Sequence, residues 1–446
     1  MENIQLIALV IFLITVGLII WGKVERSVIG IIGVAVMVFA EVMTETEAFL
    51  FVDWNIIAIL YSVWILAAYF GRTGMPEYLS VVMLKASRNN IALFLVLMGV
   101  LAALLSMFVD NVVVILLMAP VVLNITRKLK LPSFPFLIWI GLSANFMGTA
   151  LLLGDLPPQM LHSVAGIEFS EFIWQMGRPS SFIILTITFL ITACLFYQFK
   201  FRKMFSGSTI DINILTEIAN TNQGGHIKNK KFAVVVISVF LATIIAMALR
   251  QYTGLLLGFI ALIGMVTLVL ISEIFRKNLR SPDLEDVLNE IDMRTLFFYI
   301  VLFALVGGIN HTGIISMISG AMAHYLQNDQ ILGPTILYWV TAPIVGIVEH
   351  DAYILAFLYL VRDLAQSTGI NPWPLWWAIL WAGTLGSNLT VVGAPALLVS
   401  QNICEKEESC RVDLKQFFSY TVPFVLTTLI ICFILMLFIW IIPLAN

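Results

Sequence analysis

The residues best suited to chemistry in this sequence are carboxylates and amides that interrupt long apolar stretches. Asp110 and Asn111 lie in the middle of the apolar run 91–127. A carboxylate beside an amide supplies hard oxygen ligands that suit sodium or a proton. Asp110 could also cap the helix that follows it, by accepting hydrogen bonds from its first N–H groups. Because a carboxylate within so apolar a segment is costly and usually functional, we interpret this pair as an ion site.

A second cluster, Glu349, His350 and Asp351, interrupts the apolar run 331–366. Three adjacent ionisable residues can exchange protons or bind a cation. Residues one and two positions apart cannot all face the same way on a regular helix, so their convergence requires a non-helical tip. We interpret the cluster as a proton-coupling or cation site. The alternative is that Asp351 caps a helix and Glu349 is its structural partner.

Small polar residues gather with glycine and proline in two further segments, 134–166 and 373–404. Glycine and proline disrupt helical hydrogen bonding, so both segments are predicted to be helices interrupted midway. The N-terminal ends of half-helices attract anions, and freed carbonyl groups suit sodium. The candidate binding residues here are Asn145, Thr149, Asp155, Ser387, Asn388 and Thr390. The alternatives are hydrogen bonds between helices and, for Asp155, a helix cap.

The elements that must position these residues lie in a strongly apolar chain. Of its 446 residues, 60% are hydrophobic and 11% are charged, and the mean hydropathy is +1.00. Soluble proteins carry about 45–50% apolar and about 25% charged residues, so we predict an all-α polytopic membrane protein. The net charge of −3 supplies no basic field for nucleic acid. The four cysteines form no Cys-x-x-Cys zinc pattern.

Long apolar runs predict the spanning helices, each of which needs about 20 residues to cross a bilayer. The predicted spans are 4–22, 28–43, 54–70, 181–199, 232–249, 254–273, 296–310 and 420–443. The arms beside each charged tip have only about 15 residues, roughly 22 Å of helix. The hydrocarbon core is about 30 Å thick, so we predict that 91–127 and 331–366 are re-entrant hairpins whose tips meet inside the protein.

Basic residues indicate the orientation. With the N-terminus outside and each hairpin returning to its own side, all but Arg178, Arg250 and Arg362 of the 24 Lys and Arg residues fall inside. The positive-inside rule favours this arrangement. We therefore expect a multi-pass protein of the cell membrane, with both termini outside and the segment 200–230 in the cytoplasm.

The two halves of the chain align at a constant offset of 239 residues. Asp53 aligns with Asp292, Asp110 with Glu349, and Gly154 with Gly393. Because the first half starts outside and the second starts inside, the repeats are inverted, which is common in secondary transporters. The predicted organisation is a first inverted repeat at 1–199, a cytoplasmic linker at 200–230 and a second inverted repeat at 231–446.

Several of these stretches resemble motifs of the ion transporter superfamily. They are Phe108–Asn111 with Ala119 and Pro120, Ala144–Pro158, Gly307–Gly313, and Leu385–Ala394. The sequence is most similar to the branch of the arsenical pump membrane subunit and the melanosomal P protein. Citrate transporters and sodium/dicarboxylate symporters resemble it more distantly. The resemblance covers roughly residues 50–440.

This resemblance implies an elevator-type carrier that often forms a homodimer. In the symporter branch, clusters of Ser, Asn and Thr at hairpin tips and helix breaks bind carboxylate and sodium. Transferred by position, that role falls to Asp110, Asn111, Asn145, Thr149, Ser387, Asn388 and Thr390. Asp110, Asn111 and Asn388 are the candidate sodium ligands.

The predicted function is secondary transport of a small inorganic or organic anion or oxyacid, such as a carboxylate or arsenite. Protons or sodium would drive it, without any other cofactor. A sodium/proton antiporter is the main alternative; a channel or an intramembrane enzyme is more remote. The sequence has no His-Glu-x-x-His or Gly-x-Ser-x-Gly motif, which disfavours the enzyme. It has no nucleotide-binding signature either, so ATP drive would need a separate soluble ATPase subunit.

Overall fold

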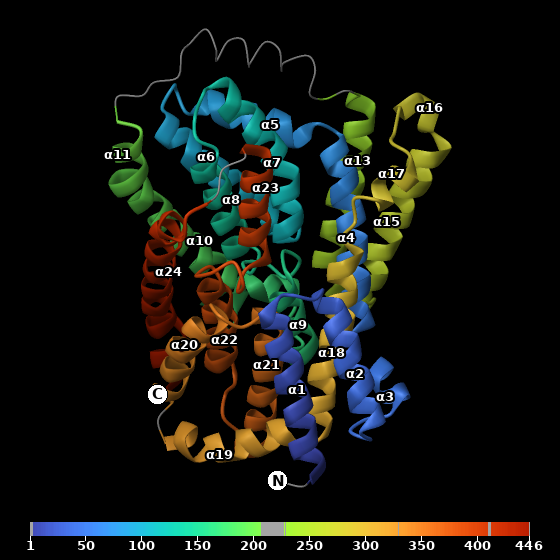
Figure 1. Ribbon diagram of the computed structural model, residues 1–446, viewed down its shortest axis with the longest axis vertical. Helices are drawn as coiled ribbons and strands as arrows, with labels where there is room; N and C mark the ends of the chain where they lie inside the picture. Colours follow the sequence, from blue (N-terminus) through green and yellow to red (C-terminus); the bar gives the residue numbers. More distant parts are fainter. Residues whose placement is uncertain (1–2, 207–226, 228, 329, 409–411, 446) are drawn as a thin grey trace.

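Helices build almost all of this computed structural model (Figure 1). It describes residues 3–206, 227, 229–328, 330–408 and 412–445. Strands among these residues are limited to one antiparallel ribbon, β1 (Trp174–Gln175) and β2 (Arg178–Pro179). The all-α prediction is therefore confirmed. Most of the predicted linker 200–230, namely 207–226 and 228, lies outside the described residues.

Eight helical segments among the described residues are long and apolar enough to cross a membrane. Six are α1 (Asn3–Trp21), α4 (Trp54–Arg72), α7 (Asn111–Lys128), α13 (Lys230–Ala248), α15 (Leu257–Ile274) and α18 (Met293–His311). The other two are composite: α10 (Ser181–Phe196), η2 (Tyr197–Phe201) and α11 (Arg202–Met204), then α24 (Leu414–Met436), η3 (Leu437–Ile441) and α25 (Ile442–Ala445). The polytopic membrane class is thus confirmed.

One predicted span is shorter than expected. In place of 28–43, the helix α2 (Arg26–Phe39) has 14 residues. Glu41 adopts a left-handed φ of 57°, which is incompatible with continuing the helix. A separate short helix, α3 (Glu45–Leu50), then begins behind Thr44, which forms a capping box with Glu47.

Two pairs of helices turn at the polar tips. α6 (Ile91–Ser106) joins α7 through 107–110, and α20 (Leu332–Val345) joins α21 (His350–Thr368) through 346–349. In Figure 1 the first pair occupies the upper half of the molecule and the second pair the lower half. The second arms are longer than predicted, with 18 residues in α7 and 19 in α21. α7 is long because Pro120 lies inside the helix rather than ending it.

Two further helices are interrupted. α8 (Phe134–Met147) and α9 (Leu156–Ala165) are separated by 148–155, and α22 (Trp373–Ser387) and α23 (Pro395–Glu408) by 388–394. In each interrupted helix, the segment after the break packs on helices from the other repeat of the chain. α9 contacts α21 and α22, whereas α23 contacts α7 and α8. The two interruptions therefore lie in the same central region as the hairpin tips.

Helix bounds recur at the offset seen in the sequence. α4 runs from 54 to 72 and α18 from 293 to 311, so both ends are shifted by 239 residues. The same shift relates the starts of α7 and α21, of α8 and α22, and of α9 and α23. The caps correspond as well, because Asp53 and Asp292 each accept from the third N–H of the helix that follows.

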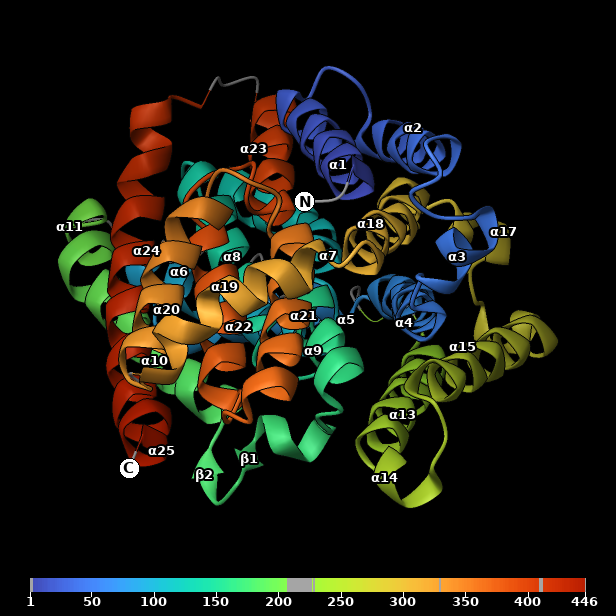
Figure 2. The same cartoon turned by 90° about the horizontal axis from the view of Figure 1, so that it is seen from below.

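The remaining helices form an outer layer and the connections. Figure 2 shows α1, α2 and α18 in one group and α4, α13 and α15 in another, both beside the central helices. α2 packs on α18 and α15 packs on α4, so each half covers a helix of the other. The connecting helices are α5 (Met75–Ala86), η1 (Phe169–Phe172), α14 (Arg250–Thr253), α16 (Arg276–Leu279), α17 (Leu284–Leu288) and α19 (Ile314–Asn328).

Candidate functional site

The first tip places a buried carboxylate at the start of α7. Asp110 is only 5% exposed, and its Oδ1 accepts from the backbone N–H groups of Val112 at 2.9 Å and Val113 at 3.3 Å. The capping interpretation therefore holds for this oxygen. No hydrogen bond to Oδ2 is recorded among the described residues, so one carboxylate oxygen of the side chain stays available for an ion.

An amide network connects this tip to both interrupted helices. Asn111 Nδ2 donates to Asp155 Oδ2 at 2.8 Å and to Asn145 Oδ1 at 2.9 Å. Asn145 Nδ2 in turn donates to Ser387 Oγ at 3.0 Å, across 242 positions of the chain. Both hydrogens of the Asn111 amide are used, so a further ligand can bind this side chain only through its amide oxygen. Four of the predicted residues thus form one buried chain of contacts.

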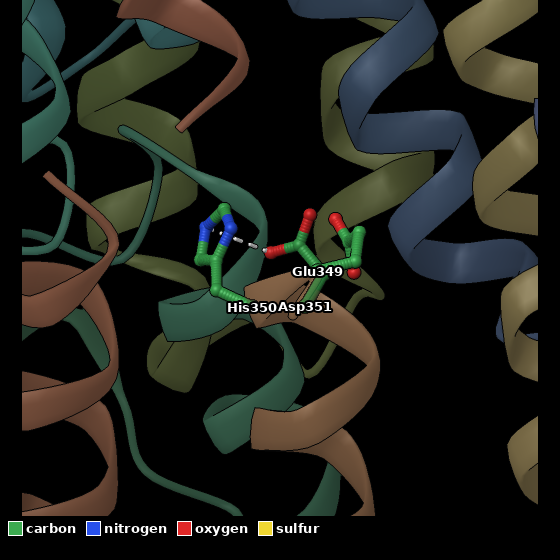
Figure 3. A group of neighbouring side chains, drawn as sticks. All are labelled: Glu349, His350 and Asp351. Atoms are coloured by element: carbon green, nitrogen blue, oxygen red, sulfur yellow. Dashed lines mark ion pairs between the residues drawn. The ribbon is translucent and has the colours of Figure 1, made fainter. Parts of the chain in front are cut away.

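The second tip holds three ionisable side chains that are almost fully buried. Glu349 caps α21 by accepting from Ala352 N–H at 2.9 Å. Figure 3 shows the His350 ring facing the Asp351 carboxylate, with Nε2 and Oδ1 3.2 Å apart. One ligand atom from each of the three residues lies within 4.8 Å of the others. The three side chains converge because Glu349 lies at the N-cap of α21, outside the regular helix.

Several polar atoms at this tip lack hydrogen-bond partners among the described residues. They are Glu349 Oε1, both ring nitrogens of His350, and Asp351 Oδ1. The 3.2 Å contact of His350 with Asp351 is thus an ion-pair distance without hydrogen-bonding geometry. A buried polar group without a partner is unfavourable, so this tip is well suited to accept a proton or a cation. Its carboxylates and imidazole could also hold a metal ion.

Polar residues in the helix breaks are mostly engaged in structural bonds. Thr149 Oγ1 donates to Thr384 Oγ1 at 2.7 Å, which joins the two interrupted helices. Thr390 Oγ1 donates to the Gly346 carbonyl group at 2.5 Å, which ties the second break to the second tip. Asp155 caps α9 through Leu156 N–H at 2.9 Å. These contacts favour the structural alternative for Thr149 and Thr390.

Asn388 is the exception in the second break. Its Nδ2 donates to the Thr384 carbonyl group at 3.2 Å, whereas its buried Oδ1 has no partner among the described residues. No recorded hydrogen bond between described residues joins Asn388 to Asp110 or Asn111, so the sodium site formed by these three residues stays a prediction.

Glycines let the hairpins dock on the helix breaks. A Cβ atom on Gly154 would lie 2.3 Å from the Ser106 carbonyl oxygen, where α6 ends. A Cβ atom on Gly393 would lie 2.5 Å from the Val345 carbonyl oxygen, where α20 ends. Both distances are far below a normal contact, so only glycine permits this approach. The two contacts are related by the 239-residue offset, which had already paired the two glycines.

A cavity of about 440 Å³ adjoins Asp110 between α4, α7 and the start of α18. Many of its lining residues are apolar, but it is also lined by Arg72, Glu77, Glu290, Asp292 and Thr295. Arg72 forms an ion pair with Glu290 at its exposed side. In the sequence, Asp292 stands out only by its alignment with Asp53, and no pattern gives Arg72 or Thr295 a role in the site. The alignment of Asp292 with Asp53, both preceding an apolar helix, was the available signal.

The network around Asn145 provides a direct test. We expect Asn145→Ala to lower the free energy of unfolding by about 1–3 kcal/mol, because it leaves buried groups of Asn111 and Ser387 without one partner. The measurement is the melting temperature of the purified protein in detergent. Asn289→Ala, at an exposed position, is the matched control and should melt like the wild type. Equal melting of both variants would show that the network adds no stability.

Comparisons with known proteins identify a family and several relatives. The citrate transporter family matches over residues 16–382. An uncharacterized transporter of Mycobacterium tuberculosis is 26% identical over 412 residues, which cover 90% of this chain and 91% of that protein. The P protein of Sus scrofa is 23% identical over 496 residues, covering 94% of this chain and 58% of the P protein. An uncharacterized transporter of Synechocystis is 20% identical over 445 residues, with 96% and 95% covered.

Proposed function

Because the chain belongs to the citrate transporter family, we propose that it is a secondary active carrier of a small anion or oxyacid, coupled to protons or sodium. The family and the relatives are transporters, so the protein is a membrane transporter and not an enzyme. The predicted resemblance to citrate transporters and to the P protein is thereby confirmed. The substrate, the coupling ion and the elevator mechanism are part of the proposal.

The observation that carries the proposal is the meeting of two hairpin tips and two helix breaks around buried polar groups. Hydrogen bonds run from Asn111 through Asn145 to Ser387. The half-helices α9 and α23 begin at the breaks. Asp155 already caps α9, so the N-terminal end of α23 is the one proposed to attract an anion. The neutral side chains of Asn145, Ser387 and Asn388 suit a carboxylate or an oxyacid better than a phosphate clamp, which uses arginine or lysine.

The internal symmetry supports the proposal of alternating access. The offset of 239 relates helix bounds, helix caps and the glycine contacts at both tips. Two inverted halves of this kind support two similar conformations, one open to each side. The hairpins and interrupted helices would then move together against the outer helices, with both termini outside and the linker in the cytoplasm. The homodimer is a further expectation of the same proposal.

Coupling is assigned to the hairpin tips. Asp110 has an oxygen available for an ion, and the Glu349, His350 and Asp351 cluster contains buried atoms without partners among the described residues. A bound cation or proton would neutralise these carboxylates, whose charge is unfavourable in an apolar interior. Transport of the anion would thus depend on prior binding of the cation.

The acidic second tip favours one other function, sodium/proton exchange without an anionic substrate. Three ionisable residues within 4.8 Å are more than an anion carrier needs for one coupling ion. A channel is less compatible with the site, because the residues of the amide network are buried and bonded to one another.

The test is a substrate screen with the purified protein in sealed proteoliposomes. Citrate, succinate and arsenite are offered separately, under an imposed proton gradient or sodium gradient. We expect saturable uptake of one anion with one gradient, together with counterflow from preloaded vesicles. Flux that does not saturate and shows no counterflow would indicate a channel. Sodium/proton exchange without uptake of any anion would support the antiporter.

A further inference from the structure

Arg26 is a charged residue whose position the proposed function leaves unexplained. It begins α2, in the outer layer, and is half-buried. Its Nη2 donates to Thr295 Oγ1 at 2.8 Å, and its guanidinium lies 4.5 Å from the centre of the Phe298 ring. A cationic side chain held over an aromatic ring and by a hydroxyl group has a fixed position.

The partner of Arg26 is itself anchored. Thr295 Oγ1 donates to Asp292 Oδ2 at 2.7 Å, and the Thr295 backbone N–H donates to Asp292 Oδ1 at 3.2 Å. Thr295 and Asp292 line the same cavity of about 440 Å³ as Asp110. Arg26 itself does not line the cavity, but its bond to Thr295 places the guanidinium directly behind the wall that Thr295 and Asp292 form.

The helix that anchors Arg26 reaches both hairpins, because Thr295 of α18 lines the cavity beside Asp110 and α18 packs on α21, which carries Asp351. Arg26 belongs to the outer helices, whereas both carboxylates belong to the hairpins. It thus supplies a charge from outside the elements proposed to bind the ion.

We propose that Arg26 is a positioning residue that provides a fixed positive counter-charge to the hairpin carboxylates, so that the coupling cation is held weakly enough to leave through the cavity. This inference rests on the proposed function. A positive charge near a cation site lowers the affinity for the cation. In its absence the cation would bind more tightly and leave more slowly.

The experiment compares Arg26→Gln and Arg26→Lys with the wild type. The melting temperature of the purified protein is titrated with sodium chloride, with choline chloride holding the ionic strength constant, and separately with pH. For Arg26→Gln, the concentration of the stabilising cation that gives half of the full rise in melting temperature is expected to be about tenfold lower than for the wild type. This is the size of effect that one nearby unit charge has on the affinity for a cation. Turnover in proteoliposomes should fall in parallel, and Arg26→Lys should restore both quantities towards the wild type.

Two further variants sharpen the result. Asp292→Asn removes a negative charge from the same wall, and asparagine can still cap α18. The half-maximal cation concentration should therefore rise in this variant, in contrast to its fall in Arg26→Gln. Arg72→Gln removes a positive charge at the exposed side of the cavity, where Arg72 pairs with Glu290. Because solvent screens this charge, the half-maximal cation concentration of Arg72→Gln should differ from that of the wild type by less than about twofold.

The outcomes separate this inference from the proposed function. Unchanged titrations in Arg26→Gln, with a normal response of the wild type, would overturn the counter-charge alone. The same shift in Arg72→Gln would also overturn it, because any positive charge in the cavity would then be sufficient. A wild type that responds to neither sodium nor protons would overturn both the counter-charge and the assignment of cation coupling.

Discussion

Asp110→Asn is expected to lower coupled anion uptake by about 100-fold, because a contact between a carboxylate and a cation contributes up to about 3 kcal/mol. Asparagine caps helices as well as aspartate does, so the bonds to Val112 and Val113 can persist in the variant. The substitution thus removes the charge and retains the start of α7. The measurement is initial uptake into proteoliposomes, normalised to the amount of inserted protein.

Glu349→Gln is the corresponding change at the second tip. Glutamine can still accept from Ala352 N–H, the bond by which Glu349 caps α21. Loss of uptake in this variant would therefore report the charge of the tip and not its fold. Asp283→Asn is the matched control, since Asp283 is a half-exposed acid far from both tips in the sequence that pairs with Arg276 at 2.5 Å. Normal uptake in both tip variants, with unchanged dependence on sodium and pH, would refute the coupling assignment.

The central polar residues could be predicted because a charged or amide side chain within a long apolar run stands out in the sequence, and its burial in an apolar interior is unfavourable. Asp110 and Glu349 interrupt long hydrophobic runs, and only binding, capping or pairing can explain such residues there. The constant offset then paired Gly154 with Gly393 before any contact between them and the hairpins was known. Local patterning and internal symmetry were sufficient for these features.

The partners of the polar residues could not be predicted in the same way. Thr149 and Asn145 were both candidate ligands, yet Thr149 is bonded to Thr384 and Asn145 to Ser387. Which helices pack together decides these bonds, and packing between segments more than 200 residues apart has no local signal. Arg26 was used only to orient the chain in the membrane, because its contact with Thr295 depends on how α2 packs on α18.

The positions of helix ends were likewise only partly predictable from the sequence. The apolar run 28–43 predicted a full span, but the left-handed conformation of Glu41 ends α2 at Phe39. Pro120 fits a helix break equally well, yet it lies inside α7. In both places the backbone conformation depends on surrounding contacts, which override the average preference of the residue.

Gly154→Ala is expected to destabilise the protein by about 3 kcal/mol or more, at the upper end of what overpacking costs. The added Cβ would lie 2.3 Å from the Ser106 carbonyl oxygen and 2.4 Å from that of Gly148. Both atoms belong to the backbone, so no side-chain rotation relieves the clash. Either the end of α6 or the break between α8 and α9 must move, and both position the amide network around Asn111.

The melting temperature in detergent and uptake into proteoliposomes test this expectation. We expect Gly154→Ala to melt about 5 °C or more below the wild type, with uptake lost in the protein that does fold. Gly17→Ala is the matched control, because nothing lies within 4 Å of the added Cβ there. Gly393→Ala should behave like Gly154→Ala, since its Cβ would lie 2.5 Å from the Val345 carbonyl oxygen. If both variants melt and transport like Gly17→Ala, the hairpins do not dock on the helix breaks, and the tips would lose the support that holds their carboxylates together.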